Sequence, residues 1–382
     1  MSGRLQTQSL AQFQCTGGAC PDTCCQGWGM QVDRPTVERY EREAPQLRDA
    51  VVSGEAEFVM RRNPDTGFCV KLGADGWCGI HREFGTDMLG DACHLFPRMP
   101  RALGETVAVM GTLSCPELAR LMIYGDNPFA LTEFGDPRQP FLMRNYLPEG
   151  LTDSAALALH QQIISVAADE TVSAERSLMR VSAIARALET QPPTAWPDTL
   201  PMYVMLADGR VPVAESSVND PFNVLHALHG LTQAATTKPS LRLRAVIDRL
   251  AEALGAHFDG ANIVLSDDAA MRALRLLERA RAAWLQPVLR RYVQAQLSQS
   301  LFPFSGFGAT LSERITTLGV RFATAKLVLA SIEEPSEQVV IDAVQPLSRF
   351  MDHLADPALT LAICHETGWV REARLRGLIG DA

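Results

Sequence analysis

Residues 13–28 read FQCTGGACPDTCCQGW and concentrate four cysteines in one short stretch. Four more follow by residue 115, and the ninth, Cys364, stands alone near the other end of the chain. The eight amino-terminal cysteines are Cys15, Cys20, Cys24, Cys25, Cys69, Cys78, Cys93 and Cys115. Eight structural half-cystines are not expected in a reducing compartment. We therefore interpret these eight side chains as ligands of a metal ion or an inorganic cluster.

The segment from Cys20 to Trp28 is expected to form a short helix that Gly27 and Gly29 would end. Pro21 suits the first position of such a helix, so that Cys20 and Cys24 would share a face. Cys25 would be rotated from Cys24 by about 100° on the same turn. The vicinal pair is therefore expected to serve two sites, or one site and the core.

The next two cysteines fall in a predicted β-hairpin. Residues 68–72 and 77–80 flank the turn sequence Gly-Ala-Asp-Gly at 73–76. With Leu72 opposite Trp77, Cys69 and Cys78 lie on one face as diagonal neighbours, roughly 7 Å apart at Cβ. Both sulfur atoms could then reach one cluster. Trp77 next to Cys78 is read either as a lid over the thiolates or as an ordinary core aromatic, and so is Trp28 next to the vicinal pair.

The last two cysteines lie in the segments CHLFPR, at 93–98, and LSCPELARL, at 113–121. Pro116 and Gly125 delimit a predicted helix that starts directly after Cys115. A helix amino terminus lowers the pKa of a nearby thiol, and we expect this effect at Cys115 and at Cys20. Four thiolates complete one tetrahedral zinc site or one 4Fe-4S cluster, and eight complete two. The spacing alone leaves the choice open.

Four segments together resemble a known family: FQCTGGACPDTCCQGW, FCVKLGADGWCGIH, CHLFPR and LSCPELARL. Their order resembles the cysteine-rich zinc- or iron-chelating family, whose hallmark is close to CxxCxxCC. More closely, it is similar to the flagellin lysine-N-methylase branch, in which an Asp and a Tyr follow the vicinal cysteines, here Asp33 and Tyr40. The motifs cover roughly residues 11–124. Beyond them the similarity is limited to stretches such as RYVQAQLSQSLFP at Arg291–Pro303.

The resemblance implies an enzyme that methylates lysine side chains on flagellin. It implies S-adenosylmethionine as the methyl donor and a 4Fe-4S cluster bound by the amino-terminal cysteines, with zinc as the alternative. Methyl transfer to an amine depends on geometry more than on strong acid–base chemistry, so no general base is assigned. Asp33 and Glu117 are candidates to accept the proton, although a turn and a first helical turn also explain them. No G-x-G-x-x-G motif marks a site for the methyl donor.

Composition limits the function classes further. The 382 residues are 47% hydrophobic and 21% charged, and 35 basic against 44 acidic side chains leave a net charge of −9. This balance argues against a surface built to neutralise nucleic acid. We see no secretory signal and no apolar run of about 18 residues, so we expect a cytoplasmic protein without a membrane partner.

The remaining chain is predicted to be helical. Apolar residues recur at three- and four-residue spacing over 154–189, 222–235, 241–254, 267–301, 312–332, 335–354 and 357–377. Pro287 is expected to kink or split its helix, and QPPTAWPDTLP at Gln191–Pro201 to be a connection. The prediction is a mainly α protein: a cysteine-rich metal or cluster module with a β-hairpin at residues 1–125, and a helical domain at 126–382.

Two functions of other classes fit the same residues. One is a non-catalytic zinc- or iron-binding interaction protein, in which metal replaces part of a hydrophobic core. The other is an iron-sulfur redox protein. A brown colour in anaerobically purified protein distinguishes iron-sulfur from zinc.

Overall fold

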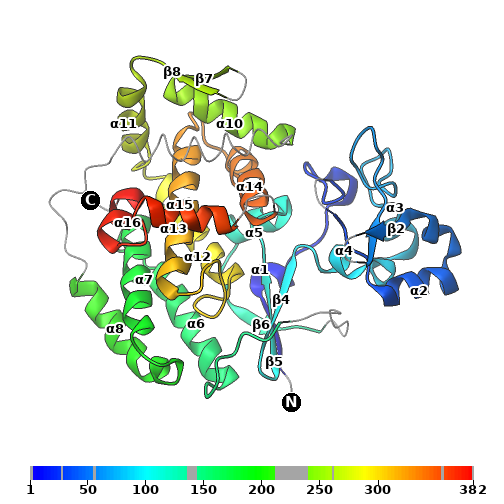
Figure 1. Ribbon diagram of the computed structural model, residues 1–382, viewed down its shortest axis with the longest axis horizontal. Coiled ribbons are helices and arrows are strands. Elements are labelled where there is room, and N and C mark those ends of the chain that lie inside the picture. The colour runs from blue at the N-terminus through cyan, green and yellow to red at the C-terminus, as the bar shows by residue number, and fades with distance from the viewer. Residues whose placement is uncertain are drawn as a thin grey trace.

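The computed structural model describes residues 3–26, 29–54, 57–135, 144–210, 240–259, 262–353 and 357–380. Most of these residues lie in helices, which confirms the mainly α prediction. Figure 1 shows a large helical body beside a smaller lobe formed by amino-terminal residues. No helix within the described ranges combines the length and the apolar character needed to cross a membrane.

A four-stranded sheet lies between the lobe and the helices. Its strands are β1 (Arg4–Thr7), β4 (Arg98–Leu103), β5 (Thr106–Gly111) and β6 (Leu131–Glu133). Their order is β4-β5-β1-β6. β1 pairs in parallel with β5, with Arg4 opposite Val107, whereas the β4–β5 and β1–β6 pairs are antiparallel. The sheet was not predicted, and it incorporates residues from both ends of the cysteine-rich region.

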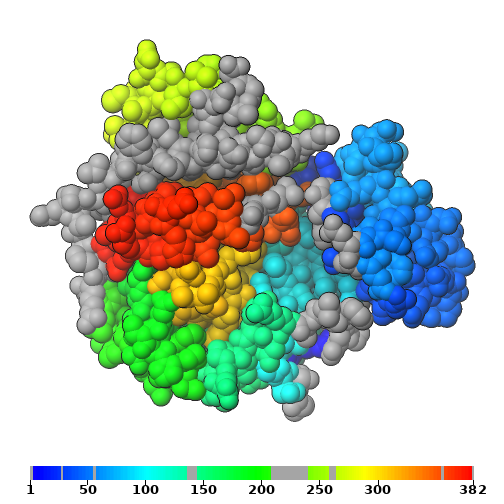
Figure 2. Space-filling model, in the orientation of Figure 1, coloured from blue at the N-terminus to red at the C-terminus, as the bar shows by residue number. Residues whose placement is uncertain are grey.

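The lobe has a hydrophobic core of its own. Its elements are α2 (Arg34–Glu43), η2 (Pro45–Ala50), β2 (Val51–Gly54), β3 (Glu57–Met60), α3 (Gly79–Phe84), η3 (Thr86–Met88) and α4 (Asp91–Leu95). Met30, Val37, Tyr40, Leu47 and Ile80 are buried together there. Figure 2 shows the lobe as a projection from one side of the molecule. The structure thus has two separate cores, and the boundary at residue 125 stays a prediction.

Three further elements lie near the sheet. α1 (Gln8–Ala11) and α5 (Pro116–Tyr124) pack into the core of the body, and η1 (Gly17–Ala19) lies on the segment that leads from α1 to the lobe. The body contains α6 (Asp153–Ala167), α7 (Ala174–Glu189), η4 (Pro193–Ala195), α8 (Trp196–Arg210), α10 (Leu241–Leu254), β7 (Ala256–Asp259), β8 (Asn262–Leu265), α11 (Ala269–Arg279), α12 (Leu285–Gln299), α13 (Leu311–Ala330), α14 (Glu337–His353), α15 (Pro357–Glu366) and α16 (Glu372–Ile379).

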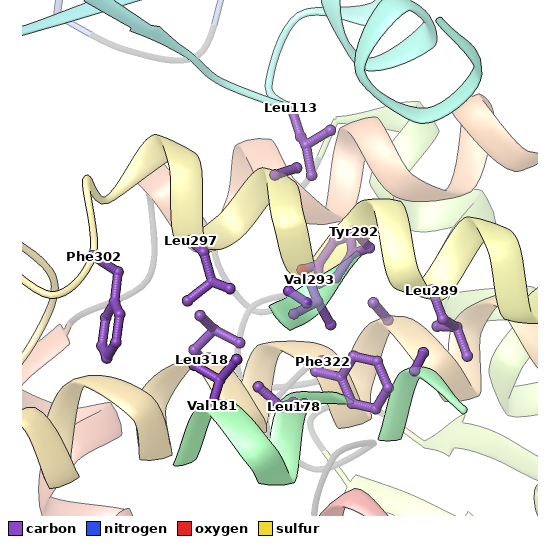
Figure 3. Close-up of a cluster of buried hydrophobic side chains, with 14 of the residues drawn as sticks. Leu113, Leu178, Val181, Leu289, Tyr292, Val293, Leu297, Phe302, Leu318 and Phe322 are labelled. Carbon is purple, nitrogen blue, oxygen red and sulfur yellow. The ribbon is translucent and has the colours of Figure 1, made fainter. Parts of the chain in front are cut away.

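The core of the body surrounds α12. Figure 3 shows Leu289, Val293 and Leu297 of α12 directed toward side chains of α7 and α13, among them Leu178 and Phe322. Leu113, from the segment after β5, packs into the same cluster from the opposite side of α12 and is fully buried. The segment that carries Cys115 is therefore anchored in the helical core.

Side-chain caps explain where several helices begin. Thr152, Ser173 and Ser240 accept hydrogen bonds at the starts of α6, α7 and α10. Thr310 and Glu313 form a reciprocal capping box at α13. Each arrangement satisfies backbone N–H groups that the first helical turn leaves without partners.

Several helix predictions need correction. The stretch 154–189 is two helices, because Ser173 caps a new one, and 267–301 is also two. Pro287 does not kink a helix, since it lies in the first turn of α12, where no backbone donor is lost. Residues 193–201 are helical rather than a connection, with Pro201 inside α8. The predicted helix at 222–235 falls outside the described residues.

The predicted hairpin at 68–80 is present only as isolated bridges, in another register. Leu72 pairs with Cys78 rather than facing Trp77, and Cys69 pairs with Arg62. The turn at Gly73–Gly76 does form, with Gly73 N donating to Trp77 O at 2.8 Å. Because α3 begins directly after Cys78, no second strand can extend. The regular hairpin of the lobe is β2–β3.

His160 on α6 gives the body a pH-dependent stability. Its Nδ1 lies 2.8 Å from the carbonyl oxygen of Phe302, and complete burial lowers the pKa of His160 to about 4. The unfolded chain binds the proton near pH 6.5. The contribution of neutral His160 to the free energy of unfolding is thus complete above pH 6.5. It is lost as the pH falls toward 4, which lowers the free energy of unfolding by about 3 kcal/mol.

We expect His160→Gln to remove this dependence. Urea unfolding of the wild type and the variant between pH 7 and pH 4 measures the difference in unfolding free energy. The free energy of unfolding of the wild type should fall toward that of the variant as the pH falls. Curves that stay parallel over this range would contradict a histidine held neutral by burial.

Candidate functional site

The structure gathers the eight amino-terminal cysteines into two groups. None of the nine cysteines of the chain is in a disulfide. We call the first group, in the core of the lobe, the lobe thiols: Cys24, Cys25, Cys69, Cys78 and Cys93. We call the second group, which lies where β1 and β5 end, the sheet-edge thiols: Cys15, Cys20 and Cys115.

The lobe thiols interact directly with one another. Cys25 and Cys69 are buried, and the other three pack against the same core. The Cys25 thiol is hydrogen-bonded to the thiols of Cys24 and Cys78. The backbone joins the same segments, since Cys69 N donates to Cys25 O at 2.9 Å. Both members of the vicinal pair thus contact the lobe core, and their service to two sites, or to one site and the core, stays a prediction.

Neighbouring thiols oppose each other's ionisation. The hydrogen bond with Cys24 is the largest influence on Cys25, and with burial and the charge of Cys69 it raises the pKa of Cys25 to about 12. The hydrogen bond with Cys25 likewise raises the pKa of Cys78, and burial raises that of Cys69. A bound cation would reverse this balance, because it stabilises thiolates.

Tyr40 brings a polar group to the lobe thiols. Its ring is fully buried, and its hydroxyl has no hydrogen-bond partner among the described residues. Burial raises the pKa of Tyr40, and the charges of nearby Cys93 and Cys78 raise it further. The hydroxyl is therefore a neutral donor next to these thiols. Buried hydroxyl groups normally have a partner, and thiolate or sulfide would supply one here.

The sheet-edge thiols meet because two strands run parallel. Since β1 and β5 point the same way, the segments that follow them leave the sheet at the same edge. Cys15 and Cys20 follow β1 and α1, and Cys115 follows β5. Burial has the largest effect on the pKa of Cys115, and the charges of Cys20 and Cys15 raise it further, so both side chains are within electrostatic range of Cys115.

The predicted lowering of two thiol pKa values is wrong. Burial raises the pKa of Cys115 to about 12, although the backbone N–H groups of Leu118 and Glu117 act in the opposite direction. Burial also raises the pKa of Cys20, which follows the helix η1 and precedes turns rather than a predicted helix. Desolvation exceeds the effect of the helix terminus at Cys115, whereas no helix begins after Cys20 to oppose desolvation there.

A close contact joins the loops that carry the two groups. Gly17 has φ +55°, and a Cβ there would lie 2.9 Å from Trp77 Cε2. A Cβ on Gly18 would lie 2.5 Å from Asp75 O. The two glycines thus let the Cys15–Cys20 loop rest on the loop before Cys78. Trp77 is 39% exposed and covers this contact, whereas Trp28 lies outside the described residues.

Polar side chains of α14 hold the first cysteine stretch against the body. Arg349 Nη1 lies 2.8 Å from Asp22 Oδ1, and these side chains are 14% and 4% exposed. Arg349 also donates to the carbonyl oxygen atoms of Thr23 and Gln26. Gln345 Nε2 donates to Asp22 Oδ2 at 2.7 Å and to Ser114 O at 3.0 Å. This one amide therefore connects the segments of both Cys20 and Cys115.

A second buried ion pair lies behind Cys115. Asp352 Oδ1 lies 2.5 Å from Arg321 Nη1, and Asp352 Oδ2 accepts from Ser114 Oγ at 2.9 Å and Thr112 Oγ1 at 3.0 Å. Burial would raise the pKa of Asp352, but the charge of Arg321 and these hydrogen bonds hold it below its usual value. Neither Asp352 nor Arg349 was predicted, because each belongs to an ordinary amphipathic helix in sequence.

The candidate proton acceptors have structural roles. Asp33 caps α2 through Thr36 N at 2.9 Å and accepts from Asp91 N at 2.8 Å, which links α2 to α4. Glu117 pairs with Arg120 at 2.6 Å within the first turn of α5. Both interactions are those expected for a cap and a first-turn carboxylate.

Cys364 belongs to the core and not to a metal site. It is fully buried on α15, and burial raises its pKa to about 11. The adjacent His365 instead contacts Glu313 at 2.9 Å.

The side chains of the two cysteine groups have the chemistry expected of ligands to a thiolate-bound metal centre. Sulfur atoms from distant segments lie together, with a neutral hydroxyl donor beside them. Within the described ranges, no three Cys, His, Asp or Glu side chains are already arranged as metal ligands. Ligation by the eight cysteines therefore stays a prediction.

Comparisons with known proteins add a distant relation. The flagellar biosynthetic protein FliU of Salmonella muenchen is 25% identical over 162 residues, 39% of this chain and 94% of that protein. Lysine-N-methylases of Salmonella typhimurium and Salmonella choleraesuis are 26% identical over 133 residues. That match spans 32% of this chain and only 33% of each lysine-N-methylase. No family model and no solved structure matches the chain.

Loss of one partner of the buried ion pair between Asp22 and Arg349 should destabilise the protein. We expect Asp22→Asn to lower the free energy of unfolding by about 3 kcal/mol, because it leaves the Arg349 charge buried without its counter-ion. The matched control is Asp248→Asn, which breaks the exposed pair with Arg244 on α10 and should change stability by less than about 0.5 kcal/mol. Urea unfolding measures both, and equal effects would contradict the structural role of the buried pair.

Proposed function

We propose that this chain transfers methyl groups from S-adenosylmethionine to lysine side chains of a protein substrate, with flagellin as the first candidate. The observation that carries the proposal is the convergence of eight cysteines from distant segments into two adjoining groups. Two relatives are lysine-N-methylases and one is a flagellar biosynthetic protein, which supports lysine methylation as the reaction and a flagellar association.

We further propose that the two groups hold inorganic centres, 4Fe-4S clusters first and zinc as the alternative. Cys25, Cys69, Cys78 and Cys93 supply four ligands in the lobe. Cys15, Cys20 and Cys115 supply three at the sheet edge, and Cys24, on the segment that Asp22 and Arg349 hold there, is the candidate for the fourth. A 4Fe-4S cluster supplies an electron-transfer centre, and zinc a structural one.

The methyl transfer needs few groups from the protein. The neutral lysine nitrogen attacks the methyl carbon of the sulfonium, so that an N–C bond forms, the S–C bond breaks and a thioether leaves. The methylated nitrogen carries a positive charge and then releases one of its own protons to solvent. Asp22, Asp33, Glu117 and Asp352 are already engaged with protein partners. We therefore assign the protein the task of holding the two reactants in line.

Loss of one lobe thiol should reduce the bound metal. We expect Cys78→Ser to lower metal content to roughly half, because one of two centres loses a ligand at the middle of its hydrogen-bonded group. The matched control is Cys364→Ser, which changes a buried cysteine outside both groups and should retain the full content. Anaerobic iron, zinc and sulfide analysis measures both, together with absorption near ~400 nm. Equal metal content in the two variants would contradict ligation by Cys78.

Methyl transfer is tested directly with metal-loaded protein. Incubation with labelled S-adenosylmethionine and purified flagellin should place label on flagellin lysines, located by peptide mass spectrometry. A flagellin with acetylated lysines is the control, and it should accept no label. If the loaded wild-type protein labels neither flagellin nor other lysine-bearing proteins, a redox or binding role replaces the proposed reaction.

A further inference from the structure

A cavity of about 590 Å³ lies in the helical body, in residues that the cysteine site does not use. It is open to solvent on one side and is bordered by α10, α11, the turn that joins α13 to α14 and the first turn of α14, in the upper part of the view in Figure 1. Its volume is in the range of small-molecule sites. Four arginines line it, Arg249, Arg272, Arg275 and Arg279, and Leu276, Ile332 and Val339 form an apolar part of its wall.

Helix geometry explains the concentration of arginines. Arg272, Arg275 and Arg279 recur at spacings of three and four residues, so they share one face of α11. Arg272 pairs with Asp268 at 2.9 Å, and Arg279 donates to Ile332 O at 2.7 Å. Arg275 is 3.8 Å from Asp268 and its side chain is 59% exposed, so its charge is only weakly paired.

Arg249 differs from the other three. Its Nη1 atom is inaccessible to water and has no hydrogen-bond partner, and no carboxylate of the described residues forms an ion pair with it. A partly buried guanidinium group without a counter-ion is unfavourable, and such groups usually have a bound partner. Because Nη1 is shielded from water, only the rest of the Arg249 side chain can face the cavity, and it brings there a guanidinium charge for which the described residues supply no ion-pair partner.

We propose that this cavity binds a small organic anion through one carboxylate or phosphate group held by Arg249 and Arg275. The apolar part of the ligand packs against Leu276, Ile332 and Val339. Glu252, Glu333 and Glu334 also line the cavity, and the Glu333 side chain is 86% exposed. These carboxylates disfavour ligands with several negative charges and accept a neutral or cationic group at the other end of the ligand.

The test is calorimetric titration of the full chain with two probes. Adenosine monophosphate presents a phosphate, and S-adenosylmethionine presents a carboxylate with a cationic sulfonium. We expect saturable binding of at least one probe, weakened about tenfold or more by Arg249→Gln and also by Arg275→Gln. The matched control is Arg244→Gln, which removes an exposed arginine of α10 that does not line the cavity and should leave binding unchanged.

The outcomes separate the sources of the anion. Binding of adenosine monophosphate alone identifies a phosphate ligand, and binding of S-adenosylmethionine alone identifies a carboxylate ligand. Circular dichroism checks the fold of Arg249→Gln, and the exposed Arg275 provides a variant with little risk of unfolding. No binding of either probe at about 1 mM, or equal binding by all three variants, would overturn the proposal. None of these outcomes depends on methyl transfer to lysine.

Discussion

The parallel pairing of β1 with β5 is the constraint on which the cysteine arrangement depends. It joins the first strand of the chain to a strand about a hundred residues later, with Arg4 opposite Val107 and Gln6 opposite Val109. Because parallel strands end at the same sheet edge, the segment with Cys15 and Cys20 emerges beside the segment with Cys115. An antiparallel pair would place them at opposite edges, and the sheet-edge thiols would have no common site.

Polar contacts, rather than apolar ones, fix the cysteine segments against the helical body. Asp22 pairs with Arg349, Gln345 reaches both Asp22 and Ser114, and Asp352 holds Ser114 from behind. Buried ion pairs contribute little net stability once desolvation is counted, but losing one partner is costly. An apolar interface would tolerate small shifts of these segments, whereas this network satisfies its hydrogen bonds in only one arrangement. The network therefore determines position more than it determines stability.

The sequence predicted local features well and long-range ones poorly. The 241–254 helix was predicted with its observed bounds, because apolar periodicity, a serine cap and a final glycine all agree there. The sheet was missed, since Arg-Leu-Gln-Thr at β1 carries almost no strand pattern and its partner is distant in sequence. The eight cysteines indicated convergence, but their division into two groups follows from the sheet. The pKa values of Cys115 and Cys20 were misjudged because burial outweighs the helix terminus at Cys115 and no helix begins after Cys20.

Burial favours the protonated form of the cysteine thiols and disfavours the thiolate form. A protonated thiol is nearly apolar, so Cys25, Cys69 and Cys115 can pack into hydrophobic cores at little cost. The same burial makes a thiolate unfavourable unless a cation lies beside it, and each neighbouring thiolate adds repulsion. Binding of the proposed metal centre would therefore release several protons, and its proposed ligands in the lobe are also side chains of the lobe core. A metal centre that replaced these protons would connect segments of the chain from β1 to α5. Its loss would loosen the lobe thiols and the sheet-edge thiols together.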